Sequence, residues 1–215
     1  MQIIEVDHPL KEHYLSILRD KNTTSENFRI YAEKLSFILL LEGSKNITLK
    51  EKPIETPLTE TTGYEIENDI VAVAVLRAGL GLVDGIKNLI PSTAIGYIGV
   101  QRNEETADPE YYYENLPDLK NKNVFILEPM LATGGSLAFA IEKIKEFDPK
   151  NIIALTVICA PEGLERIKKD HPEITLVTAK IDQNLNENWY IVPVLEIWAI
   201  GSLEQLNEKM FSTYY

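Results

Sequence analysis

The feature of this sequence that most constrains its fold is an alternation between short runs rich in valine and isoleucine and longer amphipathic stretches. The runs are residues 70–75, 94–100, 124–127, 152–158 and 174–178, and the stretches that separate most of them are residues 81–89, 137–147 and 162–169. Such runs are typical of parallel strands buried on both faces, and such stretches of the helices that connect them. The alternation predicts an α/β fold with a central, mainly parallel sheet flanked by helices.

Two helices and an arm are expected before this alternation begins. Residues 9–19 and 24–42 have helical spacing, and in the second Thr23 and Glu26 are spaced as a capping-box pair, with Gly43 placed to end the helix. Residues 44–66 hold short β-prone pieces interrupted by two prolines, which indicates an arm or hairpin outside the core. The length of the chain fits a single domain, residues 1–215.

The charge balance argues against nucleic acid and membranes as partners. The chain has 33 acidic and 21 basic residues, a formal net charge of −12, and its lysines and arginines form no long basic run. Such a surface repels phosphate backbones and anionic lipid. There is also no apolar run long enough to span a bilayer and no secretory signal pattern, so we expect a cytoplasmic protein.

Cysteine and histidine offer little chemistry. Cys159 is the only cysteine, so neither an internal disulfide nor a cysteine-based zinc cage is possible, and its apolar surroundings predict a buried, inert thiol. The three histidines lack the serine or cysteine partner of a nucleophilic triad, and we expect His8 and His171 at helix ends or surfaces. No metal site made of protein side chains is expected.

The segment 128–136, EPMLATGGS, carries the main functional signal, because it joins a predicted strand to a predicted helix. The start of a helix presents free amides to an anion, and Gly134 and Gly135 let the backbone curl around a phosphate. Thr133 and Ser136 add hydroxyl donors, and Glu128 can accept hydrogen bonds from a diol. A phosphorylated ribose carries both groups. A plain α/β connection remains the alternative, since the segment matches neither GxxxxGK[ST] nor GxGxxG.

Two more polar loops follow predicted strands. In LRAGLG, residues 76–81, Arg77 ends a buried strand and requires either an anion or a structural ion pair. Residues 101–117 combine Arg102 with several acids and three tyrosines, which predicts a long loop that is either a lid or a solvated excursion. Ligands of parallel sheets bind beyond the carboxyl ends of the strands, so the three loops are expected to meet there.

These three stretches, in this order, resemble the uracil phosphoribosyltransferase family, whose members read close to LRAGLG, YRxEET and DPMLATGGS. The resemblance continues over almost the whole chain, in His8-Pro9-Leu10, Phe28-Arg29, Ala160-Pro161-Glu162-Gly163, His171-Pro172, Ile181-Asp182-Gln183, Leu185-Asn186-Glu187 and Tyr190-Ile191-Val192-Pro193. It implies the type I phosphoribosyltransferase fold with a small β-arm or hood. It also implies transfer of 5-phosphoribosyl from phosphoribosyl pyrophosphate (PRPP) to N1 of uracil, giving UMP and pyrophosphate in pyrimidine salvage.

The resemblance also implies roles for individual residues. Glu128 would hold the ribose hydroxyls, and Arg77 and Arg102 would hold the pyrophosphate together with substrate-bound Mg²⁺. These three are the expected catalytic residues. The 5-phosphate would be held by Pro129, Met130, Leu131, Ala132, Thr133, Gly134, Gly135 and Ser136. A homodimer or higher homo-oligomer is expected, with contributions from the arm and the tail.

The chain departs from the family pattern in two places. Glu128 stands where the family has aspartate, which leaves the carboxylate one methylene longer. After Pro193 the family continues GLGDAGD, whereas this chain reads VLEIWAIG over residues 194–201. Ile197 stands at the place of the family's aspartate, Trp198 replaces an alanine, and Glu196 is a candidate to substitute for the lost acid.

Ile191, Glu196, Ile197 and Trp198 are therefore the expected base-binding residues. For Trp198 and its neighbours, packing against a predicted tail helix at 202–211 or a subunit contact is the alternative. Two further functions stay open: transfer to a different base, or a catalytically weak homologue that binds PRPP or a nucleotide as a regulator. An RNA-binding attenuator is disfavoured by the negative charge.

Overall fold

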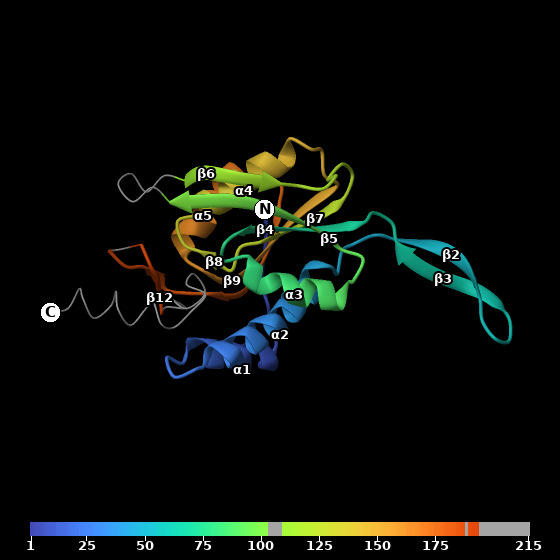
Figure 1. Ribbon diagram of the computed structural model, residues 1–215, viewed down its shortest axis with the longest axis horizontal. Helices are drawn as coiled ribbons and strands as arrows, with labels where there is room; N and C mark the ends of the chain where they lie inside the picture. Colours follow the sequence, from blue (N-terminus) through green and yellow to red (C-terminus); the bar gives the residue numbers. More distant parts are fainter. Residues whose placement is uncertain (103–108, 188, 194–215) are drawn as a thin grey trace.

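The computed structural model describes residues 1–102, 109–187 and 189–193, and its centre is a mainly parallel sheet (Figure 1). Among the described residues this sheet has eight strands. In spatial order they are β1 (Gln2–Glu5), β10 (Thr175–Ile181), β9 (Asn151–Cys159), β7 (Asn123–Leu127), β4 (Ile70–Leu76), β5 (Ala94–Arg102) and β6 (Pro109–Asn115), with β8 (Met130–Leu131) beside β9. All pairs are parallel except β5 with β6. The predicted α/β class is confirmed.

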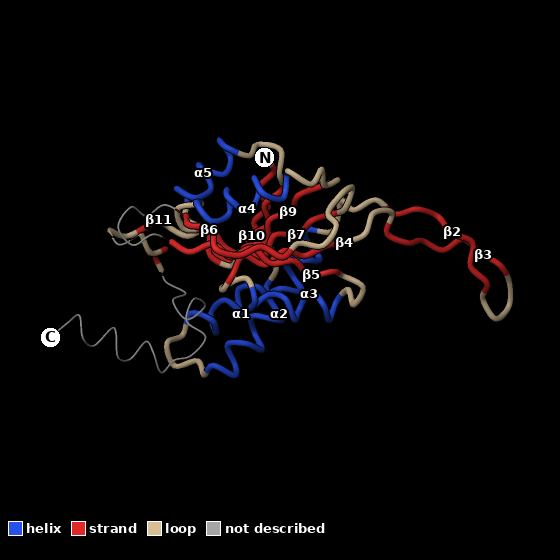
Figure 2. Tube along the Cα trace, turned by 45° about the horizontal axis from the view of Figure 1, so that its top comes forward, coloured by secondary structure: helices blue, strands red, loops and turns tan. Residues whose placement is uncertain are grey.

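Helices cover both faces of the sheet, as Figure 2 shows. One face carries α1 (Pro9–Arg19), α2 (Ser25–Gly43) and α3 (Leu80–Leu89), and the other carries α4 (Gly135–Lys145) and α5 (Pro161–Asp170). The side chains of β4 alternate between the two layers. Ile70, Ala72 and Ala74 belong to the core beneath α1, α2 and α3, whereas the three intervening valines belong to the core beneath α4 and α5. Burial on both faces explains the unbroken apolar run of this strand.

Each predicted run lies in a strand of the sheet except for Ile174, which precedes β10, and each predicted amphipathic stretch lies in a helix except for residues 146–147, which follow α4. The prediction of a long loop over residues 101–117 was wrong in part, because β5 continues to Arg102 and β6 then pairs back along it, with Tyr97 opposite Asn115. β6 lies at the edge of the sheet with its three tyrosines partly exposed, so it lacks the apolar pattern of a strand buried on both faces. Residues 103–108 lie outside the described part of the chain.

The start of α2 also differs from the expectation. Thr24, not Thr23, is the N-cap, and its hydroxyl accepts a hydrogen bond from the Asn27 amide at 3.3 Å. The Thr23 hydroxyl donates instead to the carbonyl of Ile17 at 2.6 Å, and so connects the turn between α1 and α2 to the end of α1. The predicted capping box of Thr23 with Glu26 is therefore wrong, because the Thr23 hydroxyl bonds to the Ile17 carbonyl and Thr24 caps the helix.

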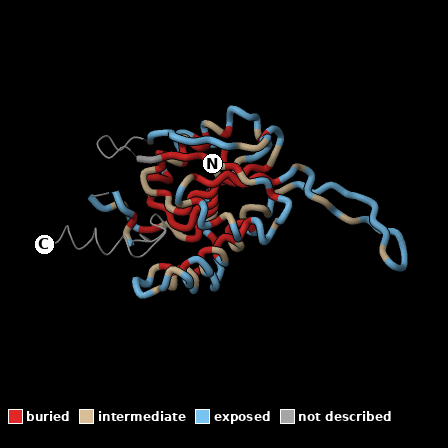
Figure 3. Tube along the Cα trace, viewed as in Figure 1, coloured by how far each residue is buried: buried red, intermediate tan, exposed pale blue. Residues whose placement is uncertain are grey.

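Residues 44–66 contain an antiparallel hairpin that projects from the body of the protein (Figure 1). Its strands are β2 (Leu49–Glu55) and β3 (Glu60–Ile66), and the hairpin is largely exposed (Figure 3), with Leu58 at its tip 96% accessible. A second, smaller hairpin of β11 (Asn184–Leu185) and β12 (Ile191–Val192) follows β10. Within the described ranges, the helices are all too short or too polar to cross a bilayer.

Candidate functional site

The three residues expected to be catalytic lie at the carboxyl ends of three neighbouring strands. Glu128 directly follows β7, Arg77 directly follows β4, and the backbone of Arg102 ends β5. Because β7, β4 and β5 are adjacent and parallel, these ends lie on one edge of the sheet. The loops predicted to meet are thus brought to the same edge.

The loop of residues 128–136 is held in place by its own backbone. The Pro129 carbonyl accepts hydrogen bonds from the amides of Val157 and Ile158 at 2.8 and 3.0 Å, and the Leu131 carbonyl accepts one from Ala160 at 2.8 Å. These bonds secure the first half of the loop to β9 and its end. The second half leads into α4, where no described side chain caps the first turn. The amides at the start of α4 are therefore free to bind an anion.

Two glycines make this geometry possible. Gly134, the N-cap of α4, has a φ of 80°, a left-handed conformation that side-chain-bearing residues rarely adopt. Gly163 in α5 approaches the loop so closely that a Cβ there would lie 2.4 Å from the Ala132 carbonyl oxygen. At the level of sequence, Gly163 was noted only as part of the resemblance to the family, and no role was assigned to it. Its proline and glycine at the start of a helix were the available signal for a close contact.

Glu128 is the main polar group buried at this edge. Its side chain is buried, its Oε2 has no hydrogen-bond partner among the described residues, and burial raises the pKa of its carboxyl group to about 8. A buried acceptor without a donor is costly, so the position favours a ligand that supplies hydroxyl donors. A nearby cation, or the water bound to one, would also fit, because positive charge would restore the carboxylate.

This buried carboxyl group predicts a pH dependence of stability. In the unfolded chain its pKa returns to the ordinary value of 4.5, so between pH 4.5 and about 8 unfolding releases a proton. The contribution of Glu128 to stability is therefore fully present below pH 4.5 and declines as the pH rises through this window. Glu128→Gln lacks the titrating group. We expect the melting temperature of the wild type to fall relative to that of Glu128→Gln between pH 5 and pH 8. Parallel melting profiles for the two proteins would contradict the burial of this group.

Arg77 is exposed at the start of the loop after β4. Within the described residues no carboxylate lies within ion-pairing distance of its guanidinium, so the structural ion pair considered as an alternative is not found there. The peptide bond between Leu76 and Arg77 is cis. Arg77 is exposed at a strand end on the same edge of the sheet as the loop that leads into α4, and an arginine in such a position is suited to an anionic ligand.

The residues expected to bind a base lie on the hairpin after β10 and beyond it. The Ile191 side chain is buried in the core. Its backbone is better placed: the Asn186 amide donates to the Tyr190 carbonyl at 2.8 Å, which makes Leu185 and Ile191 a non-hydrogen-bonded pair. The amide and carbonyl of Ile191 therefore point away from β11. Glu196, Ile197, Trp198 and the predicted tail helix lie outside the described residues.

Cys159 and His8 behave as predicted. The thiol is buried and hydrogen-bonded to the hydroxyls of Thr156 and Thr178 at 2.9 and 3.2 Å, and burial raises its pKa to about 12. Such a thiol is inert. His8 is the N-cap of α1, and its Nδ1 accepts a hydrogen bond from the Leu10 amide at 3.1 Å.

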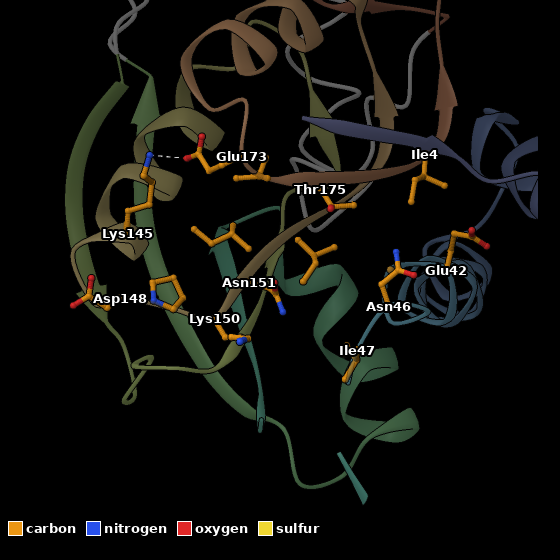
Figure 4. Close-up of a pocket in the computed structure, with 15 residues that line it drawn as sticks. Ile4, Glu42, Asn46, Ile47, Lys145, Asp148, Lys150, Asn151, Glu173 and Thr175 are labelled. Atoms are coloured by element: carbon orange, nitrogen blue, oxygen red, sulfur yellow. Dashed lines mark hydrogen bonds and ion pairs between the residues drawn. The ribbon is translucent and has the colours of Figure 1, made fainter. Parts of the chain in front are cut away.

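A cavity of about 390 Å³ lies at the opposite edge of the sheet, where β9 and β10 begin (Figure 4). Asn151 and Thr175 line it from the strand starts, and the ion pair of Lys145 with Glu173, 2.6 Å long, lies at one side. None of the residues expected to bind PRPP lines this cavity. The candidate site is therefore the edge formed by the strand ends, not this hollow.

An α/β sheet with an uncapped glycine loop after one central strand, and an arginine loop after its neighbour, is the arrangement that the sequence resemblance implied for a phosphoribosyltransferase of type I. The chain belongs to the uracil phosphoribosyltransferase family, whose sequence model matches residues 5–196.

Individual relatives agree with this assignment. Uracil phosphoribosyltransferase of Malacoplasma penetrans is 47% identical over 190 residues, covering 88% of this chain and 92% of that protein. The Wolinella succinogenes enzyme is 44% identical over 197 residues, covering 91% and 95%. Among solved structures, the AQ2163 protein from Aquifex aeolicus superposes with a TM-score of 0.89 at 36% identity, covering 93% of this chain and 98% of that one.

Proposed function

We propose that this protein, as one domain of residues 1–215, transfers the 5-phosphoribosyl group of PRPP to N1 of uracil, giving UMP and pyrophosphate. The observation that carries the proposal is the pairing of two features at one sheet edge: an uncapped helix start for a phosphate, and the buried Glu128 carboxyl with an unpartnered oxygen for hydroxyl groups. A phosphorylated ribose presents both kinds of group. Family membership specifies the sugar donor and the base.

In this proposal the loop residues 129–136 bind the 5-phosphate, mainly through the amides around Thr133 and Gly134. Glu128 accepts hydrogen bonds from the ribose hydroxyls. As the bond at C1 of the ribose breaks, negative charge grows on the leaving pyrophosphate, and Arg77 and Arg102 stabilise it. Mg²⁺ bound to PRPP would neutralise part of the same charge.

The base would be read by the segment that includes β12. The outward-pointing amide and carbonyl of Ile191 provide one donor and one acceptor, which suits the edge of a pyrimidine. Glu196, Ile197 and Trp198 complete the proposed base site. Because residues 194–201 depart from the family pattern, the acceptor base is the part of the proposal that most needs an experiment.

A homodimer or larger homo-oligomer and a cytoplasmic location belong to the same proposal. The exposed arm of β2 and β3 supports the assembly, since it carries large apolar side chains in the open, including those of Leu49, Leu58 and Tyr64. Exposed apolar side chains grouped on a projecting element are typical of an interface.

The test is pyrophosphate release by the purified protein with PRPP and Mg²⁺, across a panel of uracil, cytosine, hypoxanthine, guanine and adenine. We expect release that depends on uracil, with UMP formed in equal amount. Pyrophosphate release with a different base, and none with uracil, would identify that base as the acceptor in place of uracil. Saturable PRPP binding without release for any base would overturn the enzymatic proposal in favour of a regulatory homologue.

A further inference from the structure

A partly buried ion pair connects the last turn of α1 to the residue that follows β10. Nη2 of Arg19 donates to both carboxylate oxygens of Asp182 at 2.7 Å. The Asp182 side chain is only 3% exposed and that of Arg19 is 24% exposed. The two residues are far apart in the sequence, so the pair links elements that local structure does not connect.

Asp182 occupies the point at which the chain leaves the sheet. Its amide donates to the Cys159 carbonyl at 2.8 Å, which continues the pairing of β10 with β9. The next amide, that of Gln183, donates to the Val192 carbonyl at 3.2 Å and belongs to the β11–β12 hairpin. Asp182 is therefore the joint between the sheet and the hairpin that carries Ile191.

Other contacts of this hairpin reach α5 and the core of the protein. The Leu185 amide donates to Oε1 of Glu162 in α5 at 3.1 Å. The Ile191 side chain belongs to the same buried cluster as Leu15 and Leu18 of α1. The hairpin is thus anchored to the core through Ile191 and, at Asp182, to α1 through the ion pair with Arg19.

We propose that Arg19 and Asp182 are positioning residues, whose ion pair fixes the β11–β12 hairpin and thereby sets the affinity for the acceptor base. This inference rests on the proposed function, because it assumes that the Ile191 backbone meets the base. If Arg19 is removed, the buried Asp182 carboxylate is left without compensation, and if Asp182 is neutralised, the partly exposed Arg19 loses its partner. The joint then moves to hydrate the unpaired charge, and the Ile191 amide and carbonyl move with it. The PRPP loop is held separately, through the bonds of Pro129 and Leu131 to β9 and its end.

The kinetic test compares Asp182→Asn and Arg19→Gln with the wild type. We expect the KM for uracil to rise about tenfold, equivalent to about 1.4 kcal/mol of base affinity, while the KM for PRPP stays within about twofold. Arg19→Lys retains the charge and is expected to restore most of the uracil KM. The matched control is Lys180→Gln, which breaks the exposed Lys180–Glu5 pair on the same strand and is expected to leave both KM values unchanged.

A second readout does not depend on activity. Hydrogen exchange of residues 183–187 and 189–192 should be about tenfold faster in Asp182→Asn than in Lys180→Gln, because the hairpin opens more often. Faster exchange together with a selective rise in the uracil KM supports the proposal. Unchanged exchange, or KM values for uracil and PRPP that rise together, would overturn it. Failure of the proposed function would be seen separately: the wild type would form no UMP, while hairpin exchange would still be faster in Asp182→Asn than in Lys180→Gln.

Discussion

Gly134→Val is expected to abolish PRPP binding while the rest of the fold persists. The φ of 80° at this residue is strongly unfavourable for a β-branched side chain, and a Cβ would also lie 3.2 Å from the Gly163 carbonyl oxygen. The loop would relax to a negative φ, which turns the amides at the start of α4 away from the phosphate. With a strain of about 3 kcal/mol, affinity would fall at least 100-fold. Calorimetric titration with PRPP and Mg²⁺ measures this loss.

Two variants control for folding in that experiment. Gly134→Asn introduces a residue that tolerates the left-handed conformation, so this variant should lose much less PRPP affinity than Gly134→Val. Glu142→Gln changes an exposed side chain of α4, the helix that follows Gly134, and should bind PRPP as the wild type does. Retained PRPP affinity in a folded Gly134→Val protein would show that the phosphate binds elsewhere.

Arg102→Ala is expected to lower turnover by about 10²- to 10³-fold, which is the usual effect of removing one donor that stabilises charge in a transition state. Stability should change little, because the backbone of β5 continues to pair with β6 whatever the side chain. Steady-state pyrophosphate release and thermal unfolding are measured on the same samples. Lys143→Ala, which removes an exposed cation in the last turn of α4, is the control for a general charge effect. Unchanged turnover in Arg102→Ala would remove this arginine from the mechanism.

The interior of the sheet could be predicted from the sequence because its strands are buried on both faces. Each residue of such a strand must be apolar, as in β4, and the resulting run is hard to confuse with a loop. β6 was missed because it is an edge strand with exposed tyrosines, and the residues of such a strand need not all be apolar. The cap of α2 was misplaced because the choice between Thr23 and Thr24 depends on the Ile17 carbonyl, a contact of the folded chain.

In the candidate site, too, features set by local sequence could be predicted and features set by contacts between distant residues could not. The position of residues 128–136 between a strand and a helix could be predicted, because the loop directly follows an apolar run and precedes a stretch with helical spacing. The link from Arg19 to Asp182 could not, since it joins residues 163 positions apart and each alone reads as an ordinary surface charge. The direction in which the Ile191 amide and carbonyl point could not be predicted from the sequence, because it depends on the pairing of β11 with β12.

The hydrogen bonds from β9 and its end to Pro129 and Leu131 have a thermodynamic consequence. Ordering a flexible backbone costs roughly 1–2 kcal/mol per residue, and in this protein folding itself fixes the first half of the loop. In the proposed function, phosphate binding therefore has only the second half of the loop left to order, so less of the interaction energy is lost in immobilising the chain.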